Sequence, residues 1–205
     1  MITIAVVLAS TRPGRRGRAV AEWALGHAAA RADARFELVD LAEIDLPPLD
    51  EPLPPATGRY THEHTRSWAR TVAAYDGFLF VTPEYNHSAP GTLKNALDRV
   101  HAEWNNKAAG FVSYGFDGGV RAVEALRPVL GALQIADVSA QVALSLHHDF
   151  TDFTDFTPAE HQTAALTSTL DQLVAWSTAL ATLRPAARPA TADGAALSPA
   201  AREAP

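Results

Sequence analysis

Two short apolar runs, each leading into a polar loop, constrain the fold of this chain more than any other feature. Residues 2–8 form a continuous run rich in β-branched side chains, and residues 78–81 form a second run. Continuous apolar runs of this length are typical of strands that are buried on both faces, as in parallel sheets. Beyond the loop after the second run, apolar residues recur at helical spacing at Leu93, Ala96 and Leu97. The chain therefore predicts units in which a strand, a loop and a helix follow one another.

The same pattern continues along the chain and predicts a single α/β domain. Further strands are expected near residues 36–41, 107–113 and 137–144, with helices between them. The first helix is expected to end near Ala32, and residues 147–157 are expected to form a polar and aromatic connection. Because crossovers between parallel strands are right-handed, five such strands form a doubly wound parallel sheet with the flavodoxin-like order 2-1-3-4-5. The domain is expected to span residues 1–183. The Pro/Ala-rich residues 184–205 lack a hydrophobic period and are expected to form a flexible tail.

The composition excludes several classes of protein. The chain has 205 residues, no cysteine and a formal net charge of −6. This charge argues against a general binder of nucleic acids or anionic membranes, and the lack of cysteine removes disulfides, thiol catalysis and cysteine metal sites. No apolar run approaches the length of a membrane span, and the apolar start precedes the arginines, which reverses the order in a signal peptide. A cytoplasmic protein with no membrane or nucleic-acid partner is expected.

Three polar loops are expected at one edge of this sheet, because ligand-binding loops of open α/β sheets gather at the carboxyl ends of the strands. The first loop, residues 9–18, carries hydroxyl and guanidinium groups directly before a helix, an arrangement that favours phosphate. A solvated basic turn is the alternative interpretation, and this loop alone leaves both open. It has neither the G-x-x-x-x-G-K-[ST] pattern of a P-loop nor the G-x-G-x-x-G pattern of a dinucleotide loop, so a monophosphate fits better.

The loops after the third and fourth strands add a predicted slot for a flat ring. Tyr85, Asn86 and Tyr114 would line this slot together with backbone amides. A flat heteroaromatic group attached to a phosphate would fill both the slot and the phosphate site.

At these loops the sequence resembles the NADPH-dependent FMN reductase family of flavodoxin-like oxidoreductases, which includes quinone, azo and chromate reductases. The resemblance runs through S-T-R-P-G-R at residues 10–15, P-E-Y-N-x-S-x-P-G-x-L-K-N-A-x-D at residues 83–98 and S-Y-G-x-x-G-G-x-R-A at residues 113–122. The second motif is long and specific, and the resemblance covers nearly everything from residue 1 to about residue 180. It implies a tightly but non-covalently bound FMN.

The resemblance also implies which residues surround this cofactor. One group would hold the phosphate, a second would lie along the isoalloxazine ring, and a third would close the other side of the ring. In chain order these groups are Ser10, Arg12, Arg16 and Gly17; Pro83, Glu84, Tyr85 and Asn86; and Ser113, Tyr114 and Gly115. The backbone N–H groups of Glu84, Tyr85 and Asn86 would point toward N5 and the pyrimidine edge. Ala9 stands where the family often has glycine, so its methyl group is expected to crowd the phosphate.

The function that the resemblance implies is that of an NAD(P)H-dependent FMN reductase or quinone-type oxidoreductase with ping-pong kinetics. NADPH or NADH would stack on the exposed flavin face and pass hydride to N5. A small acceptor, such as a quinone, free flavin, an azo compound or a metal oxyanion, would then take its place. Because the flavin carries the chemistry, no catalytic side chain is expected, and Glu84 is expected to be structural. A flavodoxin-like electron carrier and a flavin-less binding or regulatory module are the alternatives.

Two further groups of side chains have simpler interpretations. The histidine-containing segments 62–64 and 147–149 lack the spacing of H-E-x-x-H, so no metal site is expected. Family members commonly pair through helices near Trp104. A homodimer or homotetramer is therefore expected. Trp104 would be either a contact between copies or a wall of a neighbour's pocket, and the contact is the favoured interpretation.

Overall fold

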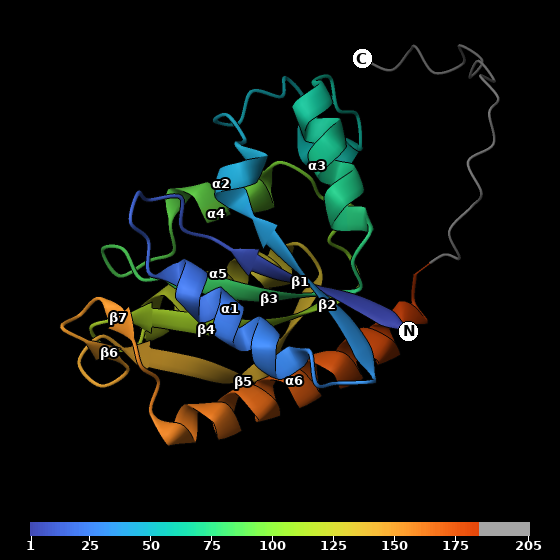
Figure 1. Ribbon diagram of the computed structural model, residues 1–205. Helices are drawn as coiled ribbons and strands as arrows, with labels where there is room; N and C mark the ends of the chain where they lie inside the picture. Colours follow the sequence, from blue (N-terminus) through green and yellow to red (C-terminus); the bar gives the residue numbers. More distant parts are fainter. Residues whose placement is uncertain (185–205) are drawn as a thin grey trace, which may run out of the picture.

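The predicted strands pair side by side in the computed structural model, which describes residues 1–184 (Figure 1). All neighbouring pairs in the main sheet are parallel, and the order is β2-β1-β3-β4-β5. The strands are β1 Ile2–Leu8, β2 Ala34–Asp40, β3 Gly77–Pro83, β4 Lys107–Gly115 and β5 Ile135–Ser145. The single flavodoxin-like domain and its strand order are thus confirmed. Apart from Arg184, the predicted tail at residues 184–205 lies outside the described residues.

Successive residues of β1 point to opposite faces of the sheet and divide the core into two clusters. Ile4 and Val6 belong to the cluster formed with α1 and α6, whereas Ala5 and Val7 belong to the cluster formed with α3, α4 and α5. Burial on both faces explains why the strand is apolar without alternation. The helices are α1 Gly17–Ala28, α2 Leu41–Ile44, α3 Glu63–Ala73, α4 Gly91–Asp98, α5 Val120–Ala132 and α6 Glu160–Ala181, with a single 3-10 turn at Pro55–Thr57.

The C-terminal end of the first helix differs from the expectation. The spacing predicts a helix that ends near Ala32, but α1 ends at Ala28. Residues 29–33 are needed for the turn that brings Ala34 into register with Ile2 at the start of β1. Pairing in the sheet therefore sets this boundary.

A second, two-stranded sheet occupies part of residues 147–157, the predicted polar and aromatic connection. Its strands are β6 Phe150–Thr151 and β7 Asp155–Phe156, which pair antiparallel. The turn between them places Asp152 and Phe153 at φ values of 49° and 58°. Such turns are normally signalled by Asn-Gly or Asp-Gly, and this sequence has neither there.

Trp104 lies in the core, so the prediction of a contact between copies at this residue is wrong. Its side chain is 1% exposed, and its indole N–H donates to the carbonyl of Leu97 at 3.2 Å. It packs edge-on against Trp68 and Phe78. None of the helices in residues 1–184 combines the length and the hydropathy that crossing a membrane requires.

Candidate functional site

The strands position three loops at the carboxyl edge of the sheet. β1 ends beside β3, with Leu8 opposite Val81, and β3 ends beside β4, with Pro83 opposite Tyr114. The alignment continues beyond the strands, since the backbone N–H of Glu84 donates to the carbonyl of Tyr114 at 2.9 Å. The loops that follow β1, β3 and β4 therefore lie next to one another.

Three hydroxyl-bearing side chains gather at this edge, two from the loops after β1 and β3 and one from the end of β4. Ser10 is fully buried, and its Oγ lies 2.9 Å from Oη of Tyr85. Tyr114 is also buried, and this burial raises its pKa above the usual value for tyrosine, so the phenol keeps its proton. The Tyr114 hydroxyl lies against the start of α1, where a Cβ on Gly17 would be 2.6 Å away. This close approach is the physical reason for a glycine at position 17.

Two of the four arginines in the first loop are already paired within the chain. Arg15 donates to the buried carboxylate of Asp40 at 2.5 Å and to the carbonyl of Ser10 at 2.8 Å. Arg18 donates to Glu22 at 2.7 Å. These two guanidinium groups stabilise the loop and the first turn of α1 rather than reaching for a ligand.

The other two arginines of this loop are not paired. Within residues 1–184, Arg12 and Arg16 make neither a salt bridge nor a side-chain hydrogen bond, and Nε of Arg16 is buried without a partner. A buried N–H group without an acceptor is costly. An anion bound from outside would supply that acceptor, and both arginines are among those predicted to hold phosphate.

Two cavities meet beside these residues. One of about 440 Å³ is lined by the arginine loop and Tyr114. The other, of about 490 Å³, lies between residues 84–87 and Phe116. Tyr85 lines both. The two cavities therefore adjoin at Tyr85, and the first of them carries the unpaired arginines.

A match to a protein family covers the three loops that form this site. A family model described as NADPH-dependent FMN reductase matches residues 2–149, which include all three loops. The chain belongs to this family. The family predicted from the motifs is thus confirmed, and with it the class of enzyme, an oxidoreductase.

Curated relatives agree with this assignment. An NAD(P)H-dependent FMN reductase of Schizosaccharomyces pombe is 39% identical over 148 residues, which are 71% of this chain and 74% of the relative. A quinone reductase of Pseudomonas putida is 36% identical over 138 residues, 62% of this chain and 69% of the relative.

Among solved structures, the flavoenzyme NAD(P)H:(acceptor) oxidoreductase FerB of Paracoccus denitrificans superposes with a TM-score of 0.69. The superposition covers 87% of this chain and 98% of FerB, at 23% sequence identity. At that identity the likeness supports the fold alone.

The loop after β3 offers a bound ring fewer free backbone N–H groups than the resemblance to FMN reductases implies. The N–H of Glu84 donates to Tyr114, and that of Tyr85 donates to the carbonyl of Ser88 at 2.8 Å. Asn86 and His87 have φ values of 50° and 65°, which close a tight turn between Tyr85 and Ser88. Of the three predicted donors, only the N–H of Asn86 has no hydrogen-bond partner in the described residues. The N–H of Glu84 pairs with β4 and that of Tyr85 closes the turn, so both already have acceptors within the chain.

The carboxylate of Glu84 holds the neighbouring loop in place. Its Oε1 accepts from Nε of Arg121 at 3.0 Å, and its Oε2 accepts from the Arg121 backbone N–H at 3.1 Å. The side chain is only 10% exposed. These contacts agree with the structural role expected for Glu84.

Ser113 and Ala9 also face away from the site. The buried Ser113 hydroxyl donates to the carbonyl of Gly118 at 2.7 Å and so supports the turn that starts at Gly115. Direct contact of Ser113 with a cofactor stays a prediction. Ala9 is buried in the core cluster on the α4 side. Its methyl group packs there and does not line the cavity beside the arginines. Crowding of the phosphate by Ala9 stays a prediction.

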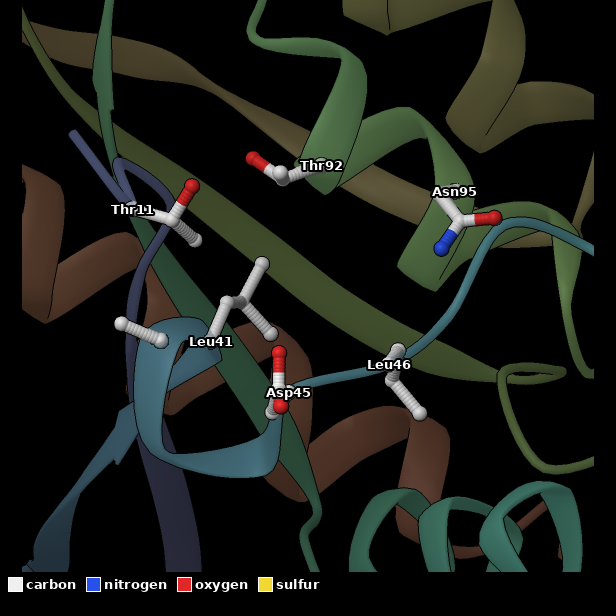
Figure 2. A pocket seen from close by; sticks show the side chains of 7 residues that line it. Thr11, Leu41, Asp45, Leu46, Thr92 and Asn95 are labelled. Atoms are coloured by element: carbon white, nitrogen blue, oxygen red, sulfur yellow. The ribbon is translucent and has the colours of Figure 1, made fainter.

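A third cavity, of about 300 Å³, lies beside Thr11 of the first loop and was not predicted from the sequence (Figure 2). Thr11, Asp45 and Thr92 line it with oxygen atoms, and Leu41 and Asn95 add to its walls. The Thr92 hydroxyl donates to the carbonyl of Ala9 at 3.0 Å. Only the short α2, which the sequence did not signal, brings Leu41 and Asp45 to this place.

Histidines and carboxylates do not gather into a metal site in the described part of the chain. No group of three or more His, Cys, Asp or Glu side chains has a suitable arrangement among residues 1–184. The rings of His62 and His64 instead stack at 5.2 Å, and His64 lies 3.0 Å from Asp50.

Proposed function

We propose that this protein binds FMN at the three loops and transfers two electrons from NADPH or NADH to a small acceptor. The observation that carries the proposal is the pair of unpaired arginines, Arg12 and Arg16, in the cavity beside the first of the family's motifs. A phosphate in that cavity would give the buried Nε of Arg16 its missing acceptor. Ser10 and Gly17 are the other residues proposed to hold the phosphate.

The start of α1 also suits a phosphate in this cavity. The first turn of the helix begins at Gly17, and backbone N–H groups at a helix N-terminus favour an anion. We propose that Pro83, Glu84, Tyr85 and Asn86 lie along the ring of FMN. The Asn86 N–H is the donor that this loop offers to the ring, and Ser113, Tyr114 and Gly115 would support its other side.

Bound FMN supplies the capacity to take up and release two electrons, which no side chain of this protein has. The protein's own residues bind the phosphate, orient the ring and shield one of its faces from water. We propose that donor and acceptor enter the slot in turn, which gives ping-pong kinetics. For a quinone acceptor the reaction balances as NAD(P)H, one proton and the quinone giving NAD(P)⁺ and the hydroquinone.

Relatives named quinone reductases favour a quinone as the acceptor. Free flavin, azo compounds and metal oxyanions are the other acceptors considered. Assembly as a homodimer or a homotetramer stays a prediction, but Trp104 is not part of the contact between copies. Light scattering coupled to size-exclusion chromatography measures the oligomeric state directly.

An FMN titration followed by anaerobic NADPH tests this proposal. We expect flavin bands at about 370 and 450 nm that are lost on adding NADPH. Arg16→Leu should weaken FMN binding about 10- to 100-fold, because it removes charge-assisted hydrogen bonds. Arg59→Leu is the matched control, since Arg59 is exposed and makes no salt bridge within residues 1–184.

The outcomes separate the competing functions. FMN that binds but is not reduced by NADPH or NADH indicates an electron carrier. A protein that binds no FMN is a flavin-less module, and the proposal is then wrong. Equal FMN affinity in the two arginine variants would remove Arg16 from the phosphate site.

A further inference from the structure

The hairpin formed by β6 and β7 lies beside the carboxyl end of β4 and the start of α1 (Figure 1). Phe150 is buried against Tyr114, and Phe156 packs on Trp23 of α1. These two phenylalanines fix the hairpin to the domain. The third one, Phe153, is at the tip and is 45% exposed.

Phe153 has a backbone conformation that a bulky residue rarely adopts. Its φ is 58°, in the left-handed region that favours glycine or asparagine. The turn closes with a hydrogen bond from the N–H of Thr154 to the carbonyl of Thr151 at 2.9 Å. A residue that is both strained and exposed adds little to folding, so its side chain points to a role in binding.

Phe153 does not stand alone at the surface. Its ring centroid lies 6.2 Å from that of Phe116 and 5.2 Å from that of His147, and Phe116 lies 5.6 Å from His147. Phe116 is 64% exposed and lines the cavity next to residues 84–87. These three side chains, called the aromatic wall below, continue the lining of the proposed ring-binding slot outward.

We propose that the aromatic wall binds the ring system of the electron acceptor and makes the enzyme prefer fused planar quinones to small inorganic acceptors. This inference rests on the proposed function. Exposed aromatic rings attract flat aromatic molecules by stacking and edge contacts. The wall extends the slot beyond the area that a single ring covers, so a second fused ring gains contact. Phe153 lies beyond residues 2–149, the part that the family model matches, whereas Phe116 and His147 lie within it.

The variant Phe153→Asn separates binding from folding. Asparagine accepts a positive φ, so we expect Tm to rise by about 2–4 °C. At the same time KM for menadione should rise about 3- to 10-fold with little change in kcat. The ratio of kcat/KM for menadione to that for ferricyanide, which has no ring, should fall by the same factor. A purely structural residue would not show higher Tm together with a selective loss for the ring-containing acceptor.

Trp176→Asn is the matched control, because Trp176 is an exposed aromatic residue on α6 and is 48% exposed. It should leave the ratio between the two acceptors unchanged. An unchanged ratio in Phe153→Asn overturns the proposal. So does a rise in KM for NADPH without a rise for menadione, which would assign the wall to the donor. A change of oligomeric state in Phe153→Asn would make the wall a contact between copies and also overturn it. Loss of FMN binding in the unmodified protein is a failure of the proposed function, and the spectrum detects it separately.

Discussion

At the scale of single residues, Gly17 joins the fold to the site. It is buried where α1 meets the end of β4, and a Cβ there would lie 2.6 Å from the Tyr114 hydroxyl and 2.8 Å from Cδ1 of Leu8. Neither neighbour has room to retreat, because both are buried in the same core cluster. The glycine lets the helix start close to the sheet, and so sets the position of Arg16.

Gly17→Ala should therefore destabilise the protein by about 1–3 kcal/mol, the usual cost of adding a methyl group to a packed site. Urea unfolding measures this loss. Gly26→Ala is the control in the same helix, because nothing lies within 4 Å of a Cβ there. It should be neutral or stabilising by up to about 1 kcal/mol. If the two variants had equal stability, the close approach at Gly17 would not be limiting.

At the scale of elements, Arg99 ties the long connection between α2 and α3 to the end of α4. The buried guanidinium donates to Asp50 at 2.8 Å and to Thr65 at 3.1 Å, and it also bonds the carbonyl of Pro47. Hydrogen bonds from His64 and then from Arg99 lower the pKa of Asp50 to about 2. One side chain thus holds a proline-rich segment that has little regular structure of its own.

We expect Arg99→Met to loosen this connection while the sheet stays folded. Losing hydrogen bonds to a charged group should speed amide exchange in residues 45–62 at least about tenfold, with little change in β1 or β3. Hydrogen exchange read by mass spectrometry resolves these segments. Arg59→Met, in the same connection but without a salt bridge in the described chain, should leave exchange unchanged. Uniform exchange across the whole chain would show instead that Arg99 supports global folding.

At the scale of the whole molecule, Lys107 makes stability depend on pH. It lies at the start of β4, at the end of the sheet opposite the site, and is 4% exposed. Its Nζ donates to the carbonyl of Val72 at 2.7 Å and lies over the ring of Phe78. Burial lowers its pKa to about 7, helped by Arg184 and opposed by Asp76 and Glu103.

Between pH 7 and about 10.4, the usual lysine pKa, the unfolded chain binds more protons at this residue than the folded chain does. The contribution of Lys107 to stability should therefore rise with pH, by up to about 1.4 kcal/mol per unit. The unfolding free energy of the wild type minus that of Lys107→Met should become more positive as the pH rises through this window. Lys94→Met is the control, since Lys94 is exposed and paired with Asp98. A difference that stays flat with pH would mean that Lys107 remains charged in the folded protein.

The periodicity of the sequence was sufficient for the fold. Apolar runs such as residues 2–8 and 78–81 favour burial on both faces, and a parallel sheet between two layers of helices provides it. The motifs at residues 83–98 and 113–122 were likewise sufficient to predict the family. Each motif is one continuous stretch of sequence, so it can be identified without knowing any distant contact. Element ends, such as that of α1, were less predictable because pairing in the sheet sets them.

The sequence by itself determined the order of the strands, the family and the set of loops that meet at the site. Only the tertiary structure decided which groups in those loops are available. Arg15 and Arg16 are neighbours in the chain, yet Asp40 neutralises the first and leaves the second with a buried, unpaired N–H. Trp104 and Phe153 show the same limit, since one is buried and the other exposed for reasons that no local pattern contains. Partners that are distant in sequence set charge, hydrogen bonding and exposure, and they become neighbours only when the chain folds.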